Sequence, residues 1–172
     1  MRQFGLIGYP LGHSFSASFF NRKFKEEGIA ARYTNFPLEN ISDFPSLLEH
    51  EPDLMGLNVT VPHKQQIIPH MDKLSPTAAD IMAVNTISIK KEGKSMFLEG
   101  DNTDVIGFRR SLEEHLEAHH KNALVLGTGG SSKAIHYVLE QLDINFVRVS
   151  RTAGLDRISY EDVDDALLAS FN

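Results

Sequence analysis

The segment Asn58-Val59-Thr60-Val61-Pro62-His63-Lys64 brings an amide, a hydroxyl and an amine close together in the sequence. Apolar residues alternate with Asn58 and Thr60, which is the period-two pattern of a β-strand with one buried face. Pro62 ends that strand and suits the first turn of a helix, where no N–H partner is needed. Lys64 would then lie in the first turn, where the helix dipole disfavours a cation and biases the lysine toward losing its proton. The segment predicts an acid–base residue facing a polyhydroxylated ligand; the alternative is a strand–turn–helix corner with a solvated lysine.

Three further segments combine turn-forming residues with hydrogen-bonding side chains. A glycine-rich turn between an expected strand and an expected helix ends in Ser14 and Ser16. Asn85 brings an amide into an apolar strand, and Asp104 closes the turn-forming run that starts at Gly100. Each segment has a structural alternative, because serine and aspartate are common helix N-caps and a strand asparagine can be satisfied by its neighbours.

In this order and spacing the four segments resemble the shikimate dehydrogenase family, from the first strand to about residue 152. The resemblance implies that the hydroxyls and carboxylate of shikimate are bound by Ser14, Ser16, Asn58, Thr60 and Asn85. It also implies that Lys64 and Asp104 form the catalytic pair, with Asp101 the less important acid. The chain departs from the family pattern beside these residues, with Ala17 in place of proline, Phe20 in place of histidine and Met82 in place of glycine.

A second glycine-rich turn follows the continuous apolar run from Ala123 to Leu126, which predicts a parallel strand covered on both faces. The turn comprises Gly127, Thr128, Gly129, Gly130 and Ser131, and a helix is expected after it. Backbone N–H groups in such a turn can reach a pyrophosphate at the positive end of the helix. Ser132 occupies the third glycine position of the dinucleotide-binding fingerprint, so a tight turn without a ligand stays the alternative.

The next expected strand ends in Ser150, Arg151 and Thr152, where dinucleotide-binding folds contact the adenosine ribose. An NAD site favours an acidic residue here, whereas the planar cation of Arg151 suits a 2′-phosphate. The segment therefore predicts NADP as the cofactor. The resemblance agrees, although the family has a further arginine where this chain has Leu155, and the sequence does not fix the direction of Arg157.

Composition excludes several other classes of function. A formal net charge of −6 and a pI near 5.7 argue against a nucleic-acid-binding surface. The sequence has no cysteine, which excludes disulfides and thiolate chemistry. No apolar stretch approaches the roughly 20 residues of a membrane span, so we expect no membrane association and a cytoplasmic enzyme.

Strands and helices are expected to alternate along the chain. Expected strands cover residues 3–8, 31–36, 54–61, 84–89, 96–99, 123–127 and 145–150, and expected helices cover 15–27, 40–49, 63–70, 75–82, 104–120, 131–142 and 159–170. This alternation predicts an α/β fold. We expect a shikimate-binding catalytic domain over residues 1–103, with a mostly parallel sheet flanked by helices. A partial Rossmann-type NADP-binding domain is expected over residues 104–172. His115 and His119 lie one helical turn apart in the expected 104–120 helix, with His120 beside them, but no third ligand is evident and no metal site is predicted.

The resemblance implies reversible hydride transfer between NADPH and 3-dehydroshikimate, giving shikimate, in aromatic amino acid (chorismate) biosynthesis. Lys64 would move the proton at the reacting oxygen. Asp104 would orient Lys64, favouring its charged form against the helix dipole, or hold a substrate hydroxyl.

The family's chains continue beyond the point where this sequence stops, and a complete dinucleotide fold needs two halves. We therefore expect a truncated chain with uncovered apolar surface that favours self-association. Two alternatives stay open, a shikimate- or quinate-binding domain without redox turnover and an NAD-dependent quinate/shikimate dehydrogenase. A tyrosine-dependent short-chain reductase is excluded, because no tyrosine is followed by lysine four positions later.

Overall fold

The computed structural model describes residues 1–93 and 95–171. The chain divides into two compact units, an N-terminal unit, Met1–Asn102, and a C-terminal unit, Thr103–Asn172. The division lies one residue from the expected domain boundary. Each unit is described by itself below.

The N-terminal unit is built on a six-stranded sheet. Its strands are β1 (Arg2–Gly8), β2 (Ala31–Pro37), β3 (Leu54–Val59), β4 (Lys73–Leu74), β5 (Thr86–Glu92) and β6 (Ser95–Asp101). Its helices are α1 (Ser16–Glu26), α2 (Phe44–His50) and α3 (Pro76–Ile81), with 3-10 turns η1 (Ile41–Asp43) and η2 (Ile68–His70).

Strand direction places several strand ends at one edge of this sheet. The order is β2-β1-β3-β5-β6-β4, and β5 alone runs against the others, since it is antiparallel to both β3 and β6. The carboxyl ends of β1, β3 and β6 therefore meet the amino end of β5 at the same edge. The loops that follow β1, β3 and β6 and the loop that precedes β5 all open at this edge.

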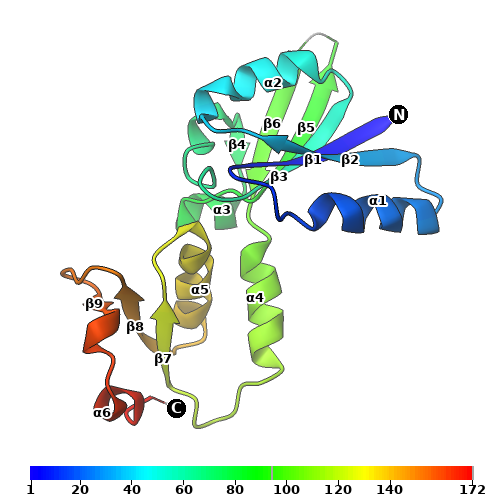
Figure 1. Ribbon diagram of the computed structural model, residues 1–172. Helices are drawn as coiled ribbons and strands as arrows, with labels where there is room; N and C mark the ends of the chain where they lie inside the picture. Colours follow the sequence, from blue (N-terminus) through cyan, green and yellow to red (C-terminus); the bar gives the residue numbers. More distant parts are fainter. Residues whose placement is uncertain (94, 172) are drawn as a thin grey trace. The chain divides into compact units, whose positions relative to one another are not determined.

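Alternation along the strands sends side chains to two different hydrophobic clusters. On one face, Leu6 and Tyr33 are buried with Phe4, Phe20 and Phe24, and the last two come from α1. On the other face the main cluster contains Phe44 of α2 together with residues of β1, β3, β5 and β6. Figure 1 shows α1 and α2 on opposite sides of β1 and β2. Helix α1 covers β1 and β2 on its face of the sheet, whereas Met55 of β3 and Ser88 of β5 are exposed on that face.

The C-terminal unit has a three-stranded parallel sheet in the order β7-β8-β9. Its strands are β7 (Asn122–Leu126), β8 (Asn145–Ser150) and β9 (Ile158–Ser159). Its helices are α4 (Asp104–Glu113), α5 (Gly130–Gln141) and α6 (Asp165–Leu168), with the 3-10 turn η3 (Tyr160–Asp162). Helix α5 links the parallel strands β7 and β8, which is the βαβ unit of dinucleotide-binding folds. With the N-terminal sheet, this unit confirms the predicted α/β fold class.

The predicted helix over residues 63–70 is wrong. Residues 61–67 form successive turns, followed only by η2. Pro69 falls within the expected helix, where it has no N–H to donate and its ring would clash with the carbonyl of Gln65. His63, 1% exposed, instead directs its Nε2 to the carbonyl of Leu38 at 2.6 Å and its Nδ1 to Gln66 Oε1 at 2.8 Å. These contacts hold the segment in turns.

Two other expected helices are shorter than predicted. Helix α4 ends at Glu113 instead of residue 120. His120 Nδ1 accepts a hydrogen bond from the backbone N–H of Glu117 at 2.9 Å, and such local bonds compete with a helix. The expected helix 159–170 is split into η3 and α6, because Asp164 is extended and its side chain caps a new helix by accepting from Leu167 N at 2.7 Å. The short strands β4 and β9 were not predicted.

Candidate functional site

Backbone hydrogen bonds tie the predicted substrate and catalytic segments of the N-terminal unit together at its carboxyl edge. Thr60 donates to the carbonyl of Ile7 at 2.9 Å, which joins the end of β3 to the end of β1. Val59 donates to the carbonyl of Asn85 at 2.8 Å, and Val84 donates to the carbonyl of Lys64 at 2.7 Å. The segments that carry Thr60, Lys64 and Asn85 are therefore direct neighbours, although they come from different parts of the sequence.

A chain of side-chain hydrogen bonds crosses the α1 face of this edge. The hydroxyl of Tyr33 donates to Asn58 Oδ1 at 2.7 Å, and Asn58 Nδ2 donates to Thr86 Oγ1 at 3.5 Å. Thr86 Oγ1 then donates to Asn85 Oδ1 at 2.9 Å. We call these four residues the Tyr33 relay. In this relay the amide oxygens of both predicted substrate asparagines, Asn58 and Asn85, accept a hydrogen bond from another side chain.

The relay also borders a cavity of about 310 Å³ on the α1 face. The cavity is lined mainly by aromatic and apolar side chains, with Asn58, Thr86 and Ser88 as its polar groups. Of the five predicted substrate residues only Asn58 lines it. This cavity is therefore not the pocket expected for a polyhydroxylated ligand.

The two predicted serines occupy the turn between β1 and α1. Ser16 is the first residue of α1, and the N-cap position belongs to Phe15, whose side chain makes no capping bond. Neither serine is thus the N-cap that the structural alternative supposed. Ser14 Oγ is buried and has no hydrogen-bond partner among the described residues. A buried hydroxyl without a partner is costly, and a ligand oxygen or a water molecule would satisfy it.

Lys64 is 8% exposed and is therefore mostly buried beside the carboxyl edge. The sequence argument placed it in the first turn of a helix, and that helix does not exist. The dipole argument made from the sequence therefore does not apply to Lys64. The alternative of a freely solvated lysine is also wrong, because the residue is buried.

The two acids of the Gly100–Asp104 segment have different roles in the structure. Asp101 Oδ1 accepts from Ser75 Oγ at 2.5 Å and from the backbone N–H of Asn102 at 2.7 Å, so this carboxylate fixes the loop. Asp104 is the first residue of α4, following Thr103 at the N-cap, and it belongs to the C-terminal unit. Asp104 is thus not the N-cap either. With Ser131 and residues of α4 and α5, it lines a cavity of about 360 Å³ within that unit.

The glycine-rich turn joins the carboxyl end of β7 to the first turn of α5. Gly127 has a φ of +107°, a conformation that favours glycine, and its N–H donates to the carbonyl of Val149 at 2.8 Å. A Cβ added at Gly129 would meet no atom within 4 Å, so the turn opens onto free space. Helix α5 has no side-chain cap at its amino end. Ser132, at the third glycine position, is buried, and its Oγ donates to the carbonyl of Gly129 at 2.6 Å. The serine replacement therefore supports the turn. An open, uncapped helix start suits a pyrophosphate.

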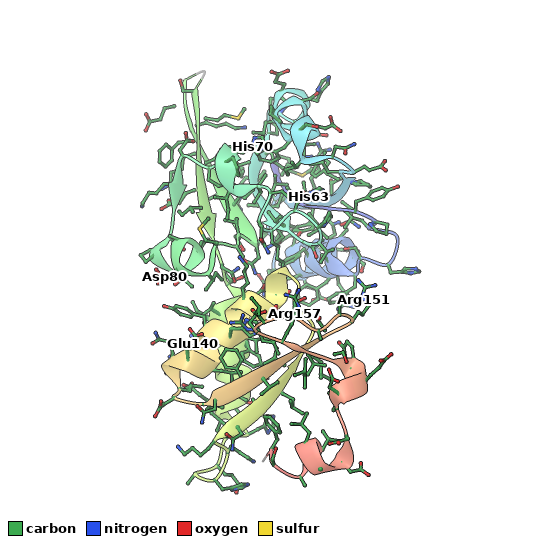
Figure 2. The ribbon with its side chains drawn as sticks, turned by 90° about the vertical axis from the view of Figure 1, so that its left-hand side faces the viewer. His63, His70, Asp80, Glu140, Arg151 and Arg157 are labelled. Carbon is green, nitrogen blue, oxygen red and sulfur yellow. The ribbon has the colours of Figure 1, made fainter. Side chains whose placement is uncertain are left out.

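Two arginines follow β8, Arg151 and Arg157, and they differ in their contacts (Figure 2). Ser150 Oγ donates to the carbonyl of Thr152 at 2.5 Å and accepts from the Thr152 N–H at 3.2 Å, which folds the backbone tightly around Arg151. Arg151 is exposed and makes no ion pair within residues 1–93 and 95–171. Arg157, whose direction the sequence left open, bonds the carbonyl of Thr152 at 3.3 Å and lies 3.6 Å from Asp156 Oδ1. Arg151 is consequently the arginine that is available for a phosphate.

Several features of the site were not predicted. Tyr33 and Thr86 were not singled out, because a tyrosine in a strand and a threonine at a strand start are ordinary residues there. Burial raises the pKa of the Tyr33 phenol, which keeps it a donor. Asn21 accepts from the N–H of Tyr33 and donates to its carbonyl, both at 2.8 Å. Sequence spacing does not reveal this contact.

Two observations concern clusters of metal-ligand side chains and long apolar helices in the part of the chain that the structure describes. No three His, Cys, Asp or Glu side chains gather there in a way that could hold a metal ion. His115 and His119 lie beyond the end of α4, so the helical spacing supposed for them does not apply. No helix among the described residues is long and apolar enough to cross a membrane.

The fold and site define a class of protein, an α/β protein with hydrogen-bonding side chains at the sheet edge of one unit and a dinucleotide-type βαβ turn in the other. Comparison with known proteins agrees. Residues 6–87 match the family model described as the shikimate dehydrogenase substrate binding domain. The chain is 42% identical to the shikimate dehydrogenase (NADP(+)) of Halothermothrix orenii over 142 residues, which is 78% of this chain and 46% of that protein.

Solved structures show the same relationship. Shikimate dehydrogenase 1 from Peptoclostridium difficile aligns with a TM-score of 0.80 and 34% identity, over 94% of this chain and 62% of that one. Shikimate 5-dehydrogenase from Thermus thermophilus, solved in complex with NADP(H) and shikimate, aligns with a TM-score of 0.75 and 30% identity, over 88% of this chain and 57% of that one. The chain belongs to the shikimate dehydrogenase family. It spans about half the length of the curated relatives it matches, from 46% to 57%.

Proposed function

We propose that the chain carries the shikimate site and the adenosine-phosphate half of the NADP site of a shikimate dehydrogenase. The reaction is the reversible NADP-dependent reduction of 3-dehydroshikimate to shikimate, a step toward chorismate and the aromatic amino acids. The observation that carries the proposal is the gathering of Asn58, Thr60, Lys64 and Asn85 at one sheet edge by direct backbone hydrogen bonds. These are the residues at which the sequence resembles the family.

Shikimate presents hydroxyls and a carboxylate, and the site presents matching donors and acceptors. The amide N–H groups of Asn58 and Asn85 suit the ligand's oxygens, because the Tyr33 relay already engages the amide oxygens. Ser14 Oγ, which has no hydrogen-bond partner among the described residues, would bind a further ligand oxygen, and Ser16 and Thr60 are proposed to bind others. Buried polar groups that lack a protein partner are the usual anchors of a polar ligand.

Lys64 is the proposed proton carrier. When the ketone is reduced, negative charge develops on its oxygen and a proton must arrive there; Lys64 donates it, and accepts a proton from the alcohol in the reverse direction. Its burial keeps bulk water from competing for this role. Asp104 is proposed to orient Lys64 or to hold a neighbouring hydroxyl of the substrate.

The residues of the C-terminal unit fit NADP. The open turn Gly127, Thr128, Gly129, Gly130 and Ser131 would hold the pyrophosphate with backbone N–H groups at the start of α5. Arg151 would bind the 2′-phosphate, with the hydroxyls of Ser150 and Thr152 beside it. When bound, the cofactor supplies or accepts the hydride. These assignments favour NADP over NAD, since the described residues put an exposed arginine where an NAD site favours a carboxylate.

A second function is favoured by one observation. The described sheet of the C-terminal unit has three strands, with β7 paired on one side only, whereas a complete dinucleotide fold has two halves. A chain with this unit could bind shikimate, or quinate, without redox turnover. Leu126 at the end of β7 is 65% exposed, and self-association through this edge belongs to the same proposal. A cytoplasmic location also stays a proposal.

The experiment that separates the two functions is NADP reduction at a wavelength that reports NADPH, with shikimate as substrate and with NAD and quinate in parallel. Turnover with NADP and shikimate supports the dehydrogenase. Shikimate binding by calorimetry without turnover supports the binding domain. The absence of both, from a chain that is folded by circular dichroism, contradicts the proposed function.

A further inference from the structure

Tyr33 is a residue of the α1 face that is held at its backbone, its ring and its hydroxyl, and the proposed reaction does not use it. Its N–H and its carbonyl are both bonded by the side-chain amide of Asn21 at 2.8 Å. Its ring stacks on Phe20 with a centroid distance of 4.7 Å and an interplanar angle of 17°. Tyr33 is 5% exposed and lies in the cluster with Leu6 and Leu11. Backbone and ring are thus both fixed, so the position of the hydroxyl is fixed as well.

The hydroxyl of Tyr33 acts on Asn58. It donates to Asn58 Oδ1 at 2.7 Å, while the nitrogen of the same amide faces Thr86 Oγ1 at 3.5 Å. An asparagine amide can turn end over end, which would exchange its acceptor for its donors. The phenol could accept from the turned amide, but Asn58 Oδ1 would then face Thr86 Oγ1, which has no proton to give it. The high pKa of the buried phenol keeps the proton in place, so this donor does not titrate away.

Thr86 extends the same ordering to the second asparagine. Because Thr86 Oγ1 donates its single proton to Asn85 Oδ1 at 2.9 Å, it can only accept from Asn58. The donors therefore run in one direction, from Tyr33 through Asn58 and Thr86 to Asn85. Reversing any one bond would leave two acceptors or two donors facing each other, at the cost of an unsatisfied buried group.

Phe20 is the stacking partner that fixes the ring of Tyr33, the first residue of the relay. The family resemblance places histidine at this position, and the ring of Phe20 instead forms the stacking partner of Tyr33. Phe20 also contacts Phe19 and Phe24, with centroid distances of 5.3 and 6.1 Å. The departure from the family pattern lies beside the relay and supports its first residue.

We propose that Tyr33 is a positioning residue for Asn58, and that its hydroxyl sets the amide so that a ligand meets N–H donors at this point of the site. This inference rests on the proposed function for its ligand, shikimate. It implies that the ligand atom at Asn58 is an acceptor, a hydroxyl or carboxylate oxygen. Tyr33 itself touches no ligand in this proposal.

The test uses the full chain with Tyr33→Phe, which removes the hydroxyl and keeps the stacked ring. We expect shikimate binding, measured by calorimetry, to weaken about 5- to 10-fold, which corresponds to the loss of one hydrogen bond that orders a buried group. Tyr160→Phe is the matched control, because this tyrosine is 47% exposed and lies in the C-terminal unit. The control is expected to bind shikimate as the unaltered chain does.

A double-mutant cycle separates positioning from a merely structural role. In an Asn58→Ala background, Tyr33→Phe is expected to cause no further loss of shikimate affinity, because the amide that it orders is gone. An equal loss in both backgrounds would overturn the proposal. Phe20→Leu keeps the hydroxyl but removes the stacked ring, and we expect a smaller loss in the same direction; it replaces Tyr33→Phe in the cycle if that variant does not fold.

A measurement without ligand keeps this proposal distinct from the proposed function. In protein labelled with ¹⁵N-asparagine, the Asn58 side-chain NH₂ resonances, assigned with Asn58→Ala, should shift and exchange faster with water in Tyr33→Phe than in the unaltered chain. Unchanged resonances would overturn the role of Tyr33 whatever the ligand. If these resonances respond but the unaltered chain does not bind shikimate, the proposed function fails and the positioning role stands.

Discussion

The two units differ in how completely their sheets are enclosed. The main hydrophobic cluster of the N-terminal unit has twelve buried members, and its sheet carries helices on both faces. Among the described residues, seventeen hydrophobic side chains are buried in the N-terminal unit and seven in the C-terminal unit, where they surround a three-stranded sheet. The stability of a small sheet depends on how much apolar surface it buries.

The two units also differ in the function proposed for them. The proposed shikimate-binding residues and Lys64 lie in the N-terminal unit. Asp104, the other proposed catalytic residue, lies in the C-terminal unit. The proposed NADP residues lie in the less enclosed C-terminal unit. If the proposed function holds, substrate binding and cofactor binding are carried by parts with separate cores. Changes in one unit should therefore alter one kind of binding and spare the other, and the following predictions test that separation.

The largest effect is expected from Lys64→Ala. If Lys64 moves the proton at the reacting oxygen, turnover of shikimate with NADP should fall about 100- to 10,000-fold, while shikimate affinity changes much less. The measurement is a comparison of kcat with the calorimetric Kd. Should the chain bind shikimate without turning it over, the small change in Kd is the part of the prediction that applies.

Lys133→Ala is the control for this prediction. Lys133 lies in α5 of the C-terminal unit, within the helix and outside the proposed phosphate turn. It should leave shikimate affinity unchanged. A near-normal kcat in Lys64→Ala would exclude a catalytic role for this residue.

Arg151→Ala should show the converse selectivity. A charge-assisted hydrogen bond contributes roughly 1.5–3 kcal/mol, so NADP affinity should fall about 10- to 100-fold while shikimate affinity is unchanged. NAD affinity should hardly change, because NAD lacks the 2′-phosphate. Calorimetry with both nucleotides measures the difference.

Arg157→Ala is the matched control, since Arg157 is engaged with Thr152 and Asp156. It should affect NADP and NAD alike. Equal losses for the two nucleotides in Arg151→Ala would show that Arg151 does not recognise the phosphate.

Acid should lower the free energy of unfolding of the C-terminal unit through the buried His136. Burial and the nearby charge of Arg148 lower the pKa of His136 below its usual value of 6.5, against smaller opposite effects of Glu140 and Asp156. The ring stacks on Phe146 with a centroid distance of 4.8 Å, and its Nε2 is buried without a partner among residues 1–93 and 95–171. Because the unfolded chain then binds the proton more readily, the stabilising contribution is present above pH 6.5 and is lost as pH falls toward the folded-state value.

Urea unfolding followed by NMR resonances of each unit, above and below that range, measures this effect. His136→Phe should remove this part of the pH dependence from the C-terminal unit. His119→Gln, at an exposed position, should keep it. An acid dependence that is unaltered in His136→Phe would assign it to other groups.

The smallest expected change in stability concerns the two described non-glycine residues with positive φ, one in each unit. Met82, at the C-cap of α3, has φ 49°, and Asp143 has φ 55°. Glycine adopts this conformation without steric cost, whereas aspartate tolerates it better than methionine does. Met82→Gly should raise the free energy of unfolding of the N-terminal unit by about 0.5–1 kcal/mol.

Asp143→Gly should gain less, and urea unfolding measures both variants. A loss of stability in Met82→Gly would mean that the half-exposed methionine side chain contributes more than its backbone costs. The family's glycine at this position is accounted for by the positive φ.

Much of this organisation could be predicted from the sequence, and the failures have local causes. Seven of the nine described strands could be predicted because apolar alternation and turn residues mark them, and Asn58 and Thr60 stand out as the polar residues of one such alternation. The expected helix at 63–70 does not form because Pro69 lacks an N–H to donate and because His63 is held by Leu38, a contact between segments distant in sequence. The direction of Arg157 and the role of Tyr33 depend on such contacts as well, since Asn21, Phe20 and Asn58 approach Tyr33 only in the folded sheet.

The most direct test of the account is an NMR titration of the ¹⁵N-labelled chain with shikimate in the absence of nucleotide. The account predicts saturable shifts in the N-terminal unit, concentrated around Ser14, Asn58 and Asn85, with a second set in the C-terminal unit appearing only when NADP is added. Shikimate shifts confined to the C-terminal unit, or no shifts from a folded chain, would contradict the central claim that the N-terminal unit carries the substrate site.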